Sequence, residues 1–342
     1  MTMLLTIRTA HRPATDLGFL LHKHPEHVHT REFPFGNATC LKGARVKLPT
    51  RTQRIDLPGN ARVLMRVELG ADPREAIALQ HGITMHATGT PAIAAPVDIS
   101  LFTNDALPGV EGFDSAPAVL SAEEDINPGA HRLQAKVRAV AAAAGRSVER
   151  GRINSVIREK GWRTLRQKLA MMGVEGHGWM RPKVVGTYGD DWLMRTAANY
   201  SGIWANTSDE VMYFGIGTGT PLDGGRRYTA TFPKGDLPGD HVKYFWSVIA
   251  VDGVTFRVIP NVKKRFLLNP QSELQFGHDG SLTLYFAPRR PPGAPDGNWL
   301  PTPSGQPYLL TWRSYGPDEA ILSGAWFPPP LLEVSSFQEA VV

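Results

Sequence analysis

A period of two runs through Pro307-Tyr-Leu-Leu-Thr-Trp-Arg-Ser-Tyr315, near the end of this 342-residue chain. Tyr308, Leu310 and Trp312 fall on one side of an extended backbone, and the residues between them fall on the other. Residues 227–233 and 281–286 repeat the alternation, and residues 243–251 form a dense run of β-branched and aromatic side chains. These segments predict strands that bury at least one face.

Glycine-containing turn signals separate these segments. They are Asp223-Gly224-Gly225, Asp252-Gly253, Asp279-Gly280, Asp296-Gly297 and Ser304-Gly305. Short strands with such turns are typical of an antiparallel sandwich. We therefore predict an α+β chain that is mainly β, in which residues 176–336 form a jelly-roll-like antiparallel β-sandwich and residues 337–342 form a tail.

Residues 131–175 have a helical period instead. Leu133, Val137, Val140 and Ala144 lie on one face of a helix that Gly145 ends. A second helical segment follows Ser147, and Gly161 is expected to bend or divide it. Further on, Asp190 or Asp191 is expected to cap a short helix over residues 192–200.

The net charge of +5 belongs to the N-terminal half. Residues 1–175 carry 23 Lys/Arg against 17 Asp/Glu, and residues 131–168 alone carry +9. Several basic side chains on these helices could neutralise phosphates of a nucleic acid; they are Arg138, Arg146, Arg152, Lys160, Arg163 and Lys168. Aromatic residues are sparse there, so we favour a solvated helix face and hold nucleic acid to be the less favoured partner.

Residues 41–130 are poorly periodic and rich in proline. We predict irregular strands and loops there, with residues 61–69 as the best alternating run, and assign the region no role. The first twenty residues lack an apolar signal core, and no stretch reaches the roughly 18 apolar residues of a membrane span. We therefore expect a cytoplasmic protein without a membrane partner.

Blocks of the C-terminal half occur in an order that identifies a family. They are Gly186-Thr-Tyr-Gly-Asp-Asp-Trp-Leu-Met-Arg195, Leu222-Asp-Gly-Gly-Arg-Arg-Tyr228, Phe232-Pro-Lys-Gly235, Tyr244-Phe-Trp-Ser247, Asp279-Gly-Ser-Leu-Thr-Leu-Tyr285, Asn298-Trp-Leu-Pro301 and Gly324-Ala-Trp-Phe-Pro-Pro329. Together, over about residues 178–334, they resemble the domain of unknown function 1214 family. The resemblance implies an antiparallel β-sandwich but no reaction and no cofactor. The domain numbered 1254, which often accompanies this family, is not recognisable in residues 41–130.

The opening of the chain resembles a different family. Residues 3–36 contain Leu4-Leu-Thr-Ile-Arg-Thr-Ala-His-Arg-Pro-Ala-Thr-Asp-Leu-Gly18 and Leu20-Leu-His-Lys-His-Pro25. They are similar to the start of the bacterial RNA 3′-terminal ribose 2′-O-methyltransferase, which works beside an RNA end-repair kinase and ligase. The similarity ends near Cys40, and no glycine-rich methyl-donor loop follows. We interpret residues 1–40 as a remnant or fusion junction without methyltransferase activity.

Four histidines lie within eight residues of this opening: His22, His24, His27 and His29. Imidazole pairs on one strand face bind zinc or nickel. However, Pro25 interrupts the strand, and no carboxylate pair completes a site. The single cysteine, Cys40, excludes a cysteine-rich zinc centre. We assign no metal and no cofactor, and keep the four histidines as weak candidates.

The polar residues within the family-like blocks are the candidate ligand site: Tyr188, Arg265, Asn298, Trp299, Arg313 and Tyr315. Arg313 and Tyr315 share a strand face and could clamp a carboxylate or sugar hydroxyls. Asp190 and Asp191 point opposite ways on an extended chain and make a poor acid–base pair. The tryptophans could stack on a sugar, although such residues more often fill a sandwich core.

Three hypotheses follow. The leading one is a protein of unknown function whose sandwich binds a small polar or carbohydrate-like ligand, with catalysis left open. The second is a non-catalytic RNA-associated binding module that uses the basic helices at 131–168. The third is a fusion product whose N-terminal half is functionless. No nucleophile elbow, Walker loop, zincin helix or cysteine redox motif selects a reaction, and the oligomeric state stays open.

Overall fold

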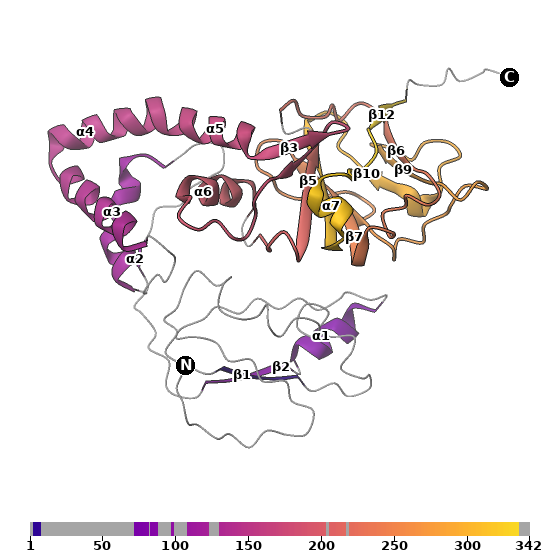
Figure 1. The fold of residues 1–342 in the computed structure, drawn as a ribbon, viewed down its shortest axis with the longest axis horizontal. Coiled ribbons are helices and arrows are strands. Elements are labelled where there is room, and N and C mark those ends of the chain that lie inside the picture. The colour runs from indigo at the N-terminus through magenta and orange to yellow at the C-terminus, as the bar shows by residue number, and fades with distance from the viewer. Residues whose placement is uncertain are drawn as a thin grey trace. The chain divides into compact units, whose positions relative to one another are not determined.

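The computed structural model describes residues 3–7, 72–81, 83–87, 97–98, 108–122, 130–202, 205–216 and 219–334 (Figure 1). The chain divides into two compact units. One comprises residues 1–100 and 109–155, and the other comprises residues 101–108 and 156–342. None of the described helices is long and apolar enough to cross a membrane.

The first unit combines a two-stranded sheet with short helices. Strand β1 (Met3–Ile7) pairs antiparallel with β2 (Ile83–Ala87), and Met3 lies opposite Ala87. The helices of this unit are α1 (Pro73–His81), the 3₁₀ turn η2 (Val110–Phe113), α2 (Ala116–Ala122), α3 (Ala130–Ala144) and most of α4 (Ser147–Val156).

We predicted irregular strands and loops for residues 41–130, but the structure has two helices there, α1 and α2. Pro73 is the first residue of α1, and Asp72 Oδ1 accepts a hydrogen bond from Arg74 N at 3.0 Å. Proline is favoured at a helix start because its missing N–H would have no partner there. Pro117 likewise lies in the first turn of α2. Pro73 and Pro117, which we interpreted as turn signals, therefore lie at helix starts. The alternating run predicted at residues 61–69 lies outside the described residues.

The predicted basic helices are confirmed. Helix α3 ends before Gly145, and α4 begins at Ser147. The expected irregularity at Gly161 is one turn of π-helix over Ile157–Gly161, followed by α5 (Trp162–Met171). Wider turns of this kind are typical interruptions of long helices.

Two sheets make up the second unit, which confirms the mainly β fold (Figure 1). The larger sheet has, in spatial order, β3 (Gly173–Gly176), β4 (Trp179–Pro182), β5 (Val211–Ile216), β11 (Tyr308–Pro317), β7 (Val242–Asp252) and β8 (Leu267–Leu268). The smaller has β10 (Trp299–Pro301), β9 (Leu282–Ala287), β6 (Tyr228–Phe232) and β12 (Leu332–Glu333). Helices α6 (Trp192–Ser201) and α7 (Glu319–Ser323) and the 3₁₀ turn η4 (Asp296–Asn298) connect them. Contrary to a purely antiparallel sandwich, β10 runs parallel to β9.

The alternating residues form the core between the sheets, as the sequence predicts. Tyr308, Leu310 and Trp312 of β11 are at most 1% exposed. Trp312 stacks on Trp246 of β7 at 4.7 Å and contacts Phe232 of the smaller sheet at 5.2 Å. All four tryptophans considered as stacking platforms are buried, namely Trp246, Trp299, Trp312 and Trp326. They therefore fill the sandwich rather than present an aromatic surface to a ligand.

The predicted Asp-Gly turns form through the aspartate side chains. Asp252 Oδ1 accepts hydrogen bonds from the backbone N–H of Val254 and Thr255, at 3.0 and 2.7 Å. Asp279 Oδ1 accepts one from Ser281 N at 2.9 Å, and Gly280 has the positive φ of +81° that this turn requires. Side-chain oxygens of this type replace backbone turn bonds.

Candidate functional site

Arg265 fixes the loop that leads into β10. Its Nη2 donates to Asp296 Oδ2 at 2.6 Å, and its Nη1 donates to Trp299 O at 3.0 Å and to Asp296 O. Asn261 in turn accepts from the backbone N–H of Arg265 at 3.1 Å. The guanidinium therefore clamps η4 in place and is already occupied by protein oxygens.

Asn298 and Trp299 continue this arrangement. Asn298 is 1% exposed, and its Nδ2 donates to Gln275 O and Thr283 O, both at 2.8 Å. Its Oδ1 accepts from Gln275 N at 2.8 Å. Trp299 Nε1 donates to Ala287 O at 2.9 Å. Because both amide donors and the indole N–H are used, these side chains hold β10 beside β9.

Arg313 lies on the outer face of the larger sheet, opposite to the core face that contains Trp312. Across the sheet it faces Tyr213 on β5 and Ser247 on β7. Its Nε donates to Ser247 Oγ at 3.0 Å. Its two terminal nitrogens have no partner among the described residues. We call Tyr213, Ser247, Thr311 and Arg313 the outer polar patch.

Tyr315 shares this face with Arg313 but is 5% exposed. Its ring stacks on Phe245 of β7, with centroids 4.0 Å apart and planes inclined by 16°. The pair forms an apolar wall beside the outer polar patch. Tyr315 therefore contributes packing next to Arg313, and little of its surface is open to a ligand.

Tyr188 lies in another neighbourhood, beside α5 and α6. It packs against the cluster that contains Leu165 and Met194, and the Arg195 guanidinium lies 5.4 Å from its ring centre. Asp191 is the N-cap of α6, since its Oδ1 accepts from Met194 N at 2.9 Å. This confirms the expected cap. The six predicted ligand residues thus fall into three places: Arg265 with Asn298 and Trp299, Arg313 with Tyr315, and Tyr188 alone.

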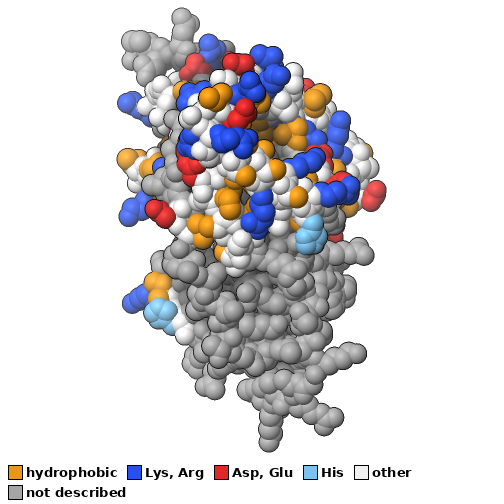
Figure 2. Space-filling view, turned by 90° about the vertical axis from the view of Figure 1, so that its left-hand side faces the viewer, with side chains coloured by type: hydrophobic (Ala, Val, Ile, Leu, Met, Phe, Trp, Pro, Cys, Tyr) orange, Lys and Arg blue, Asp and Glu red, His pale blue; other side chains and the backbone are white. Residues whose placement is uncertain are grey.

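Half of the predicted nucleic-acid residues have partners within the chain. Arg138 donates to Pro117 O at 3.3 Å, Arg152 pairs with Glu149 at 3.4 Å, and Lys168 pairs with Asp191 at 2.6 Å. The others, Arg146, Lys160 and Arg163, are exposed. In Figure 2 the Lys and Arg side chains drawn in colour are interspersed with acidic and apolar ones. The basic residues thus resemble an ordinary solvated helix surface.

His241 joins two carboxylates in a cluster that the sequence did not indicate. Its Nδ1 lies 2.8 Å from Asp318 Oδ2, and its Nε2 lies 2.7 Å from Asp236 Oδ1. Its ring packs at 4.9 Å on Trp326, whose Nε1 also donates to Asp236 Oδ1 at 2.9 Å. Asp318 and His241 are 77 residues apart, so no local spacing could reveal the cluster.

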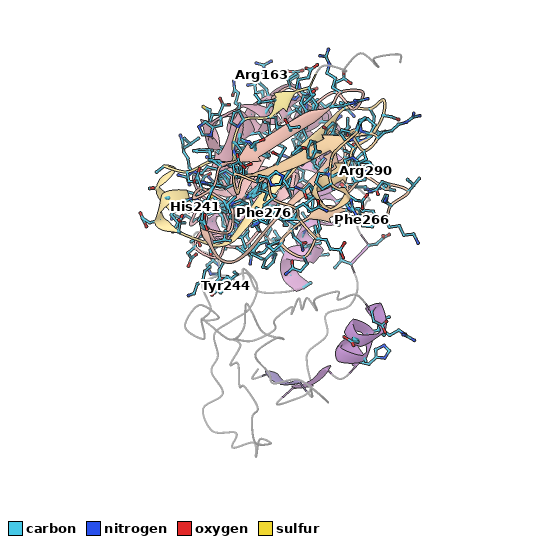
Figure 3. The ribbon with its side chains drawn as sticks, turned by 90° about the vertical axis from the view of Figure 1, so that its right-hand side faces the viewer. Arg163, His241, Tyr244, Phe266, Phe276 and Arg290 are labelled. Atoms are coloured by element: carbon cyan, nitrogen blue, oxygen red, sulfur yellow. The ribbon has the colours of Figure 1, made fainter. Side chains whose placement is uncertain are left out.

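The cluster ties three segments together. It joins the turn after β6, the start of β7 and the N-terminus of α7, which Asp318 caps through Ile321 N at 2.9 Å. Figure 3 shows His241 at one edge of the sandwich, away from Phe266 and Arg290. With both nitrogens engaged, the imidazole has no free atom for acid–base chemistry, so we assign it a positioning role.

Among the described residues, no group of three or more His, Cys, Asp or Glu side chains is arranged to hold a metal ion. The weak metal candidates His22, His24, His27 and His29 lie outside the described residues.

Comparison with known families finds two separate matches, one near each end of the chain and each over less than half of it. Residues 211–319 match the family described as protein of unknown function (DUF1214). This confirms the C-terminal resemblance. Residues 3–63 match a second family model, described as RNA repair, ligase-Pnkp-associating, region of Hen1. This confirms the N-terminal resemblance and carries it beyond Cys40, where we expected it to end.

One solved structure supports the fold, and the fold alone. The VPA0106 protein from Vibrio parahaemolyticus is similar with a TM-score of 0.50 and 19% identity, over 86% of this chain and 74% of that chain. An uncharacterised protein from Burkholderia cenocepacia has a TM-score of 0.25 and 15% identity, over 52% of this chain and 41% of that chain. No curated protein matches.

The His241 cluster generates a stability prediction. His241→Ala removes the two short contacts with the carboxylates of Asp236 and Asp318 and the contact with Trp326. We expect it to lower the free energy of unfolding by about 1–3 kcal/mol, measured by urea denaturation. His278→Ala, at an exposed histidine, is the control and should unfold like the wild type. An unchanged urea midpoint for His241→Ala would show that the cluster does not hold its three segments.

Asp296 generates a pH prediction. Hydrogen bonds from Arg265 and then Lys263 hold the pKa of its carboxyl below the ordinary value. A lowered native pKa stabilises the fold above the unfolded value of about 3.9, and this contribution fades as the pH falls further. Asp296→Asn should therefore be less stable than the wild type at pH 7, and the difference should shrink below about pH 4. Asp190→Asn, at an exposed aspartate, should show no such convergence; a constant difference for Asp296→Asn would contradict the assignment.

Proposed function

We propose that the β-sandwich binds a small polar ligand, carbohydrate-like or carrying a carboxylate, at the outer polar patch. The proposal rests chiefly on Arg313. Arg265, Asn298 and Trp299 already donate to protein oxygens, so the proposed site contains fewer of the residues that we predicted from the sequence. The proposal concerns binding, and no group at the patch selects a reaction.

Arg313 is suited to recognition because one edge of its guanidinium is anchored. The bond from Nε to Ser247 Oγ orients the planar fork and leaves its terminal N–H groups for an incoming oxygen pair. Orientation before binding reduces the entropy lost when a ligand is held. A guanidinium that already pairs with a carboxylate, as that of Arg265 does, offers no such donors.

The surroundings of Arg313 favour a ligand with hydroxyl groups. Thr311 lies two residues away on the same strand face, and Tyr213 is directly across on β5. The Tyr213 hydroxyl is held by Asn206, since it accepts from Asn206 N at 3.2 Å and donates to Asn206 Oδ1 at 3.3 Å, so it has only acceptor capacity left for a ligand hydroxyl. The stacked pair of Phe245 and Tyr315 adds an apolar border. Polar groups beside an apolar surface are typical of small-molecule sites.

A ligand screen tests the proposal. Hydroxy acids and monosaccharides that raise the Tm of the wild type should lose their effect with Arg313→Ala. Losing charge-assisted bonds of about 1.5–3 kcal/mol corresponds to a Kd that rises about 10- to 150-fold. Arg313→Lys should bind with intermediate strength because lysine keeps the charge without the fork.

Arg289→Ala is the matched control, because Arg289 is exposed on the second unit. It should retain every ligand-induced shift. Retention of the same shifts by Arg313→Ala would remove the outer polar patch as the site.

A second candidate function is association with RNA. It is favoured by the similarity of residues 3–63 to a region described as RNA repair and by three exposed basic side chains, Arg146, Lys160 and Arg163. Reversing these three charges to Glu in the full chain should weaken the binding of single-stranded RNA, measured by fluorescence anisotropy. The slope of log K against log salt should fall by about 0.7 for each lost phosphate contact. Reversal of Arg289 and Arg290 is the control; equal effects of both variants would reject the helices as the site.

A further inference from the structure

A turn between β7 and β8 carries an apolar side chain that lies entirely in solvent. Val262 is at its tip and is 100% exposed. Asn261 closes the turn, since its backbone oxygen accepts from Lys264 N at 2.9 Å. The side chain of Asn261 also accepts from Arg265 N at 3.1 Å and donates to Arg265 O at 2.7 Å. The turn is therefore held in one shape, although nothing within the chain covers its tip.

Two phenylalanines add to this exposed apolar surface. Phe266 and Phe276 are 44% and 54% exposed, more than any other aromatic side chain among the described residues. Each directly follows a residue that η4 holds, because Arg265 bonds to Asp296 and Gln275 bonds to Asn298. In Figure 3 Phe266 and Arg290 lie towards the same edge of the sandwich. Isolated exposed apolar residues are ordinary, whereas a group of them marks an interaction surface.

The charge around this turn is positive, in contrast to the rest of the second half of the chain. Residues 253–298 carry six Lys/Arg against three Asp/Glu, which gives +3. The remainder of residues 176–342 carries eight against twelve, which gives −4. Two of the six basic residues directly follow Val262, namely Lys263 and Lys264. Lys263 pairs with Asp296 at 3.1 Å, whereas Lys264 is exposed and has no partner among the described residues.

An anionic lipid surface matches both properties. We propose that the turn of residues 261–266, together with Phe276, attaches the sandwich peripherally to a bilayer that contains acidic lipids. Val262 and Phe266 enter the interface, and Lys264 remains at the level of the headgroups, where its charge is neutralised. The prediction that the chain has no membrane partner rested on the lack of a spanning segment, which peripheral attachment does not need. The proposal does not depend on the ligand site at Arg313.

A protein partner fits this surface less well. A standard protein interface buries about 800 Å² on each side, whereas the exposed apolar groups here are few and lie on narrow turns. A bilayer requires no complementary shape and gains from each apolar side chain and each positive charge. Single-stranded RNA would stack its bases on aromatic rings, but the fully exposed tip residue, Val262, is aliphatic.

Co-sedimentation of the full chain with vesicles tests the proposal. The wild type should bind equimolar phosphatidylglycerol and phosphatidylcholine more tightly than phosphatidylcholine alone. Val262→Asp should weaken binding to the acidic vesicles by about tenfold or more, because it removes the apolar tip and adds a charge that the lipids repel. Lys264→Gln should weaken it about fivefold, the effect of one positive charge near an anionic surface. Both positions are exposed, so both variants should keep the Tm of the wild type.

Lys183 and Val184 provide matched controls, because they are an exposed lysine and valine side by side outside residues 253–298. Lys183→Gln and Val184→Asp should bind vesicles like the wild type, and so should Arg313→Ala. Equal binding by the wild type and Val262→Asp would overturn the proposal, as would equal binding to acidic and neutral vesicles. A wild type that ignores vesicles but forms a dimer sensitive to Val262→Asp would assign the turn to a second copy of the chain instead.

Discussion

Strand β11 is hydrogen-bonded on both sides, to β5 from Tyr315 to Leu310 and to β7 along nearly its whole length. A strand in this central position cannot shift by one residue without exchanging its two faces. Its register therefore decides that Trp312 enters the core and Arg313 stays outside. Core packing on Trp246 and Phe232 holds that register, because the alternative would bury Arg313 and expose Trp312. The outer polar patch exists only because this one pairing is fixed.

The segment that follows α7 packs against core residues of β4 and β5. Trp179 Nε1 donates to Pro329 O at 2.9 Å, and Phe327 contacts Phe214 at 5.4 Å between ring centres. The His241 cluster holds the beginning of this region through Asp318, and Gly324 brings its next turn onto Arg181. The surroundings of Arg181 thus depend on a segment anchored by aromatic packing at one end and by charged hydrogen bonds at the other.

Strands with a period of two and turns opened by Asp-Gly were predictable from sequence, because each is a local pattern with a local cause. Strands β3 and β10 were not, since four and three residues carry too little periodicity. The parallel pairing of β10 with β9 depends on tertiary contacts, such as the bond from Asn298 to Thr283 O. Proline misled the prediction at α1 because the same residue opens both turns and helices.

Local sequence patterns also could not predict which polar residues are available to a ligand. Arg265, Asn298, Arg313 and Arg181 are all polar residues in β-rich sequence, and nothing local separates them. What separates them is whether the fold already uses their donors. Arg265 and Asn298 give theirs to Asp296, Trp299, Gln275 and Thr283.

Arg313 is anchored through one nitrogen at a partly open surface, where an unused donor is solvated at little cost. Arg181 has the same spare capacity inside the core, where an unused donor costs far more. A fold that keeps such a cation must offset it by packing or by a bound anion. Gly324 packs against the Nε–Nη2 edge of Arg181, so packing fills the place that an anion would need, and the exposed arginine is the one with donors open to a ligand.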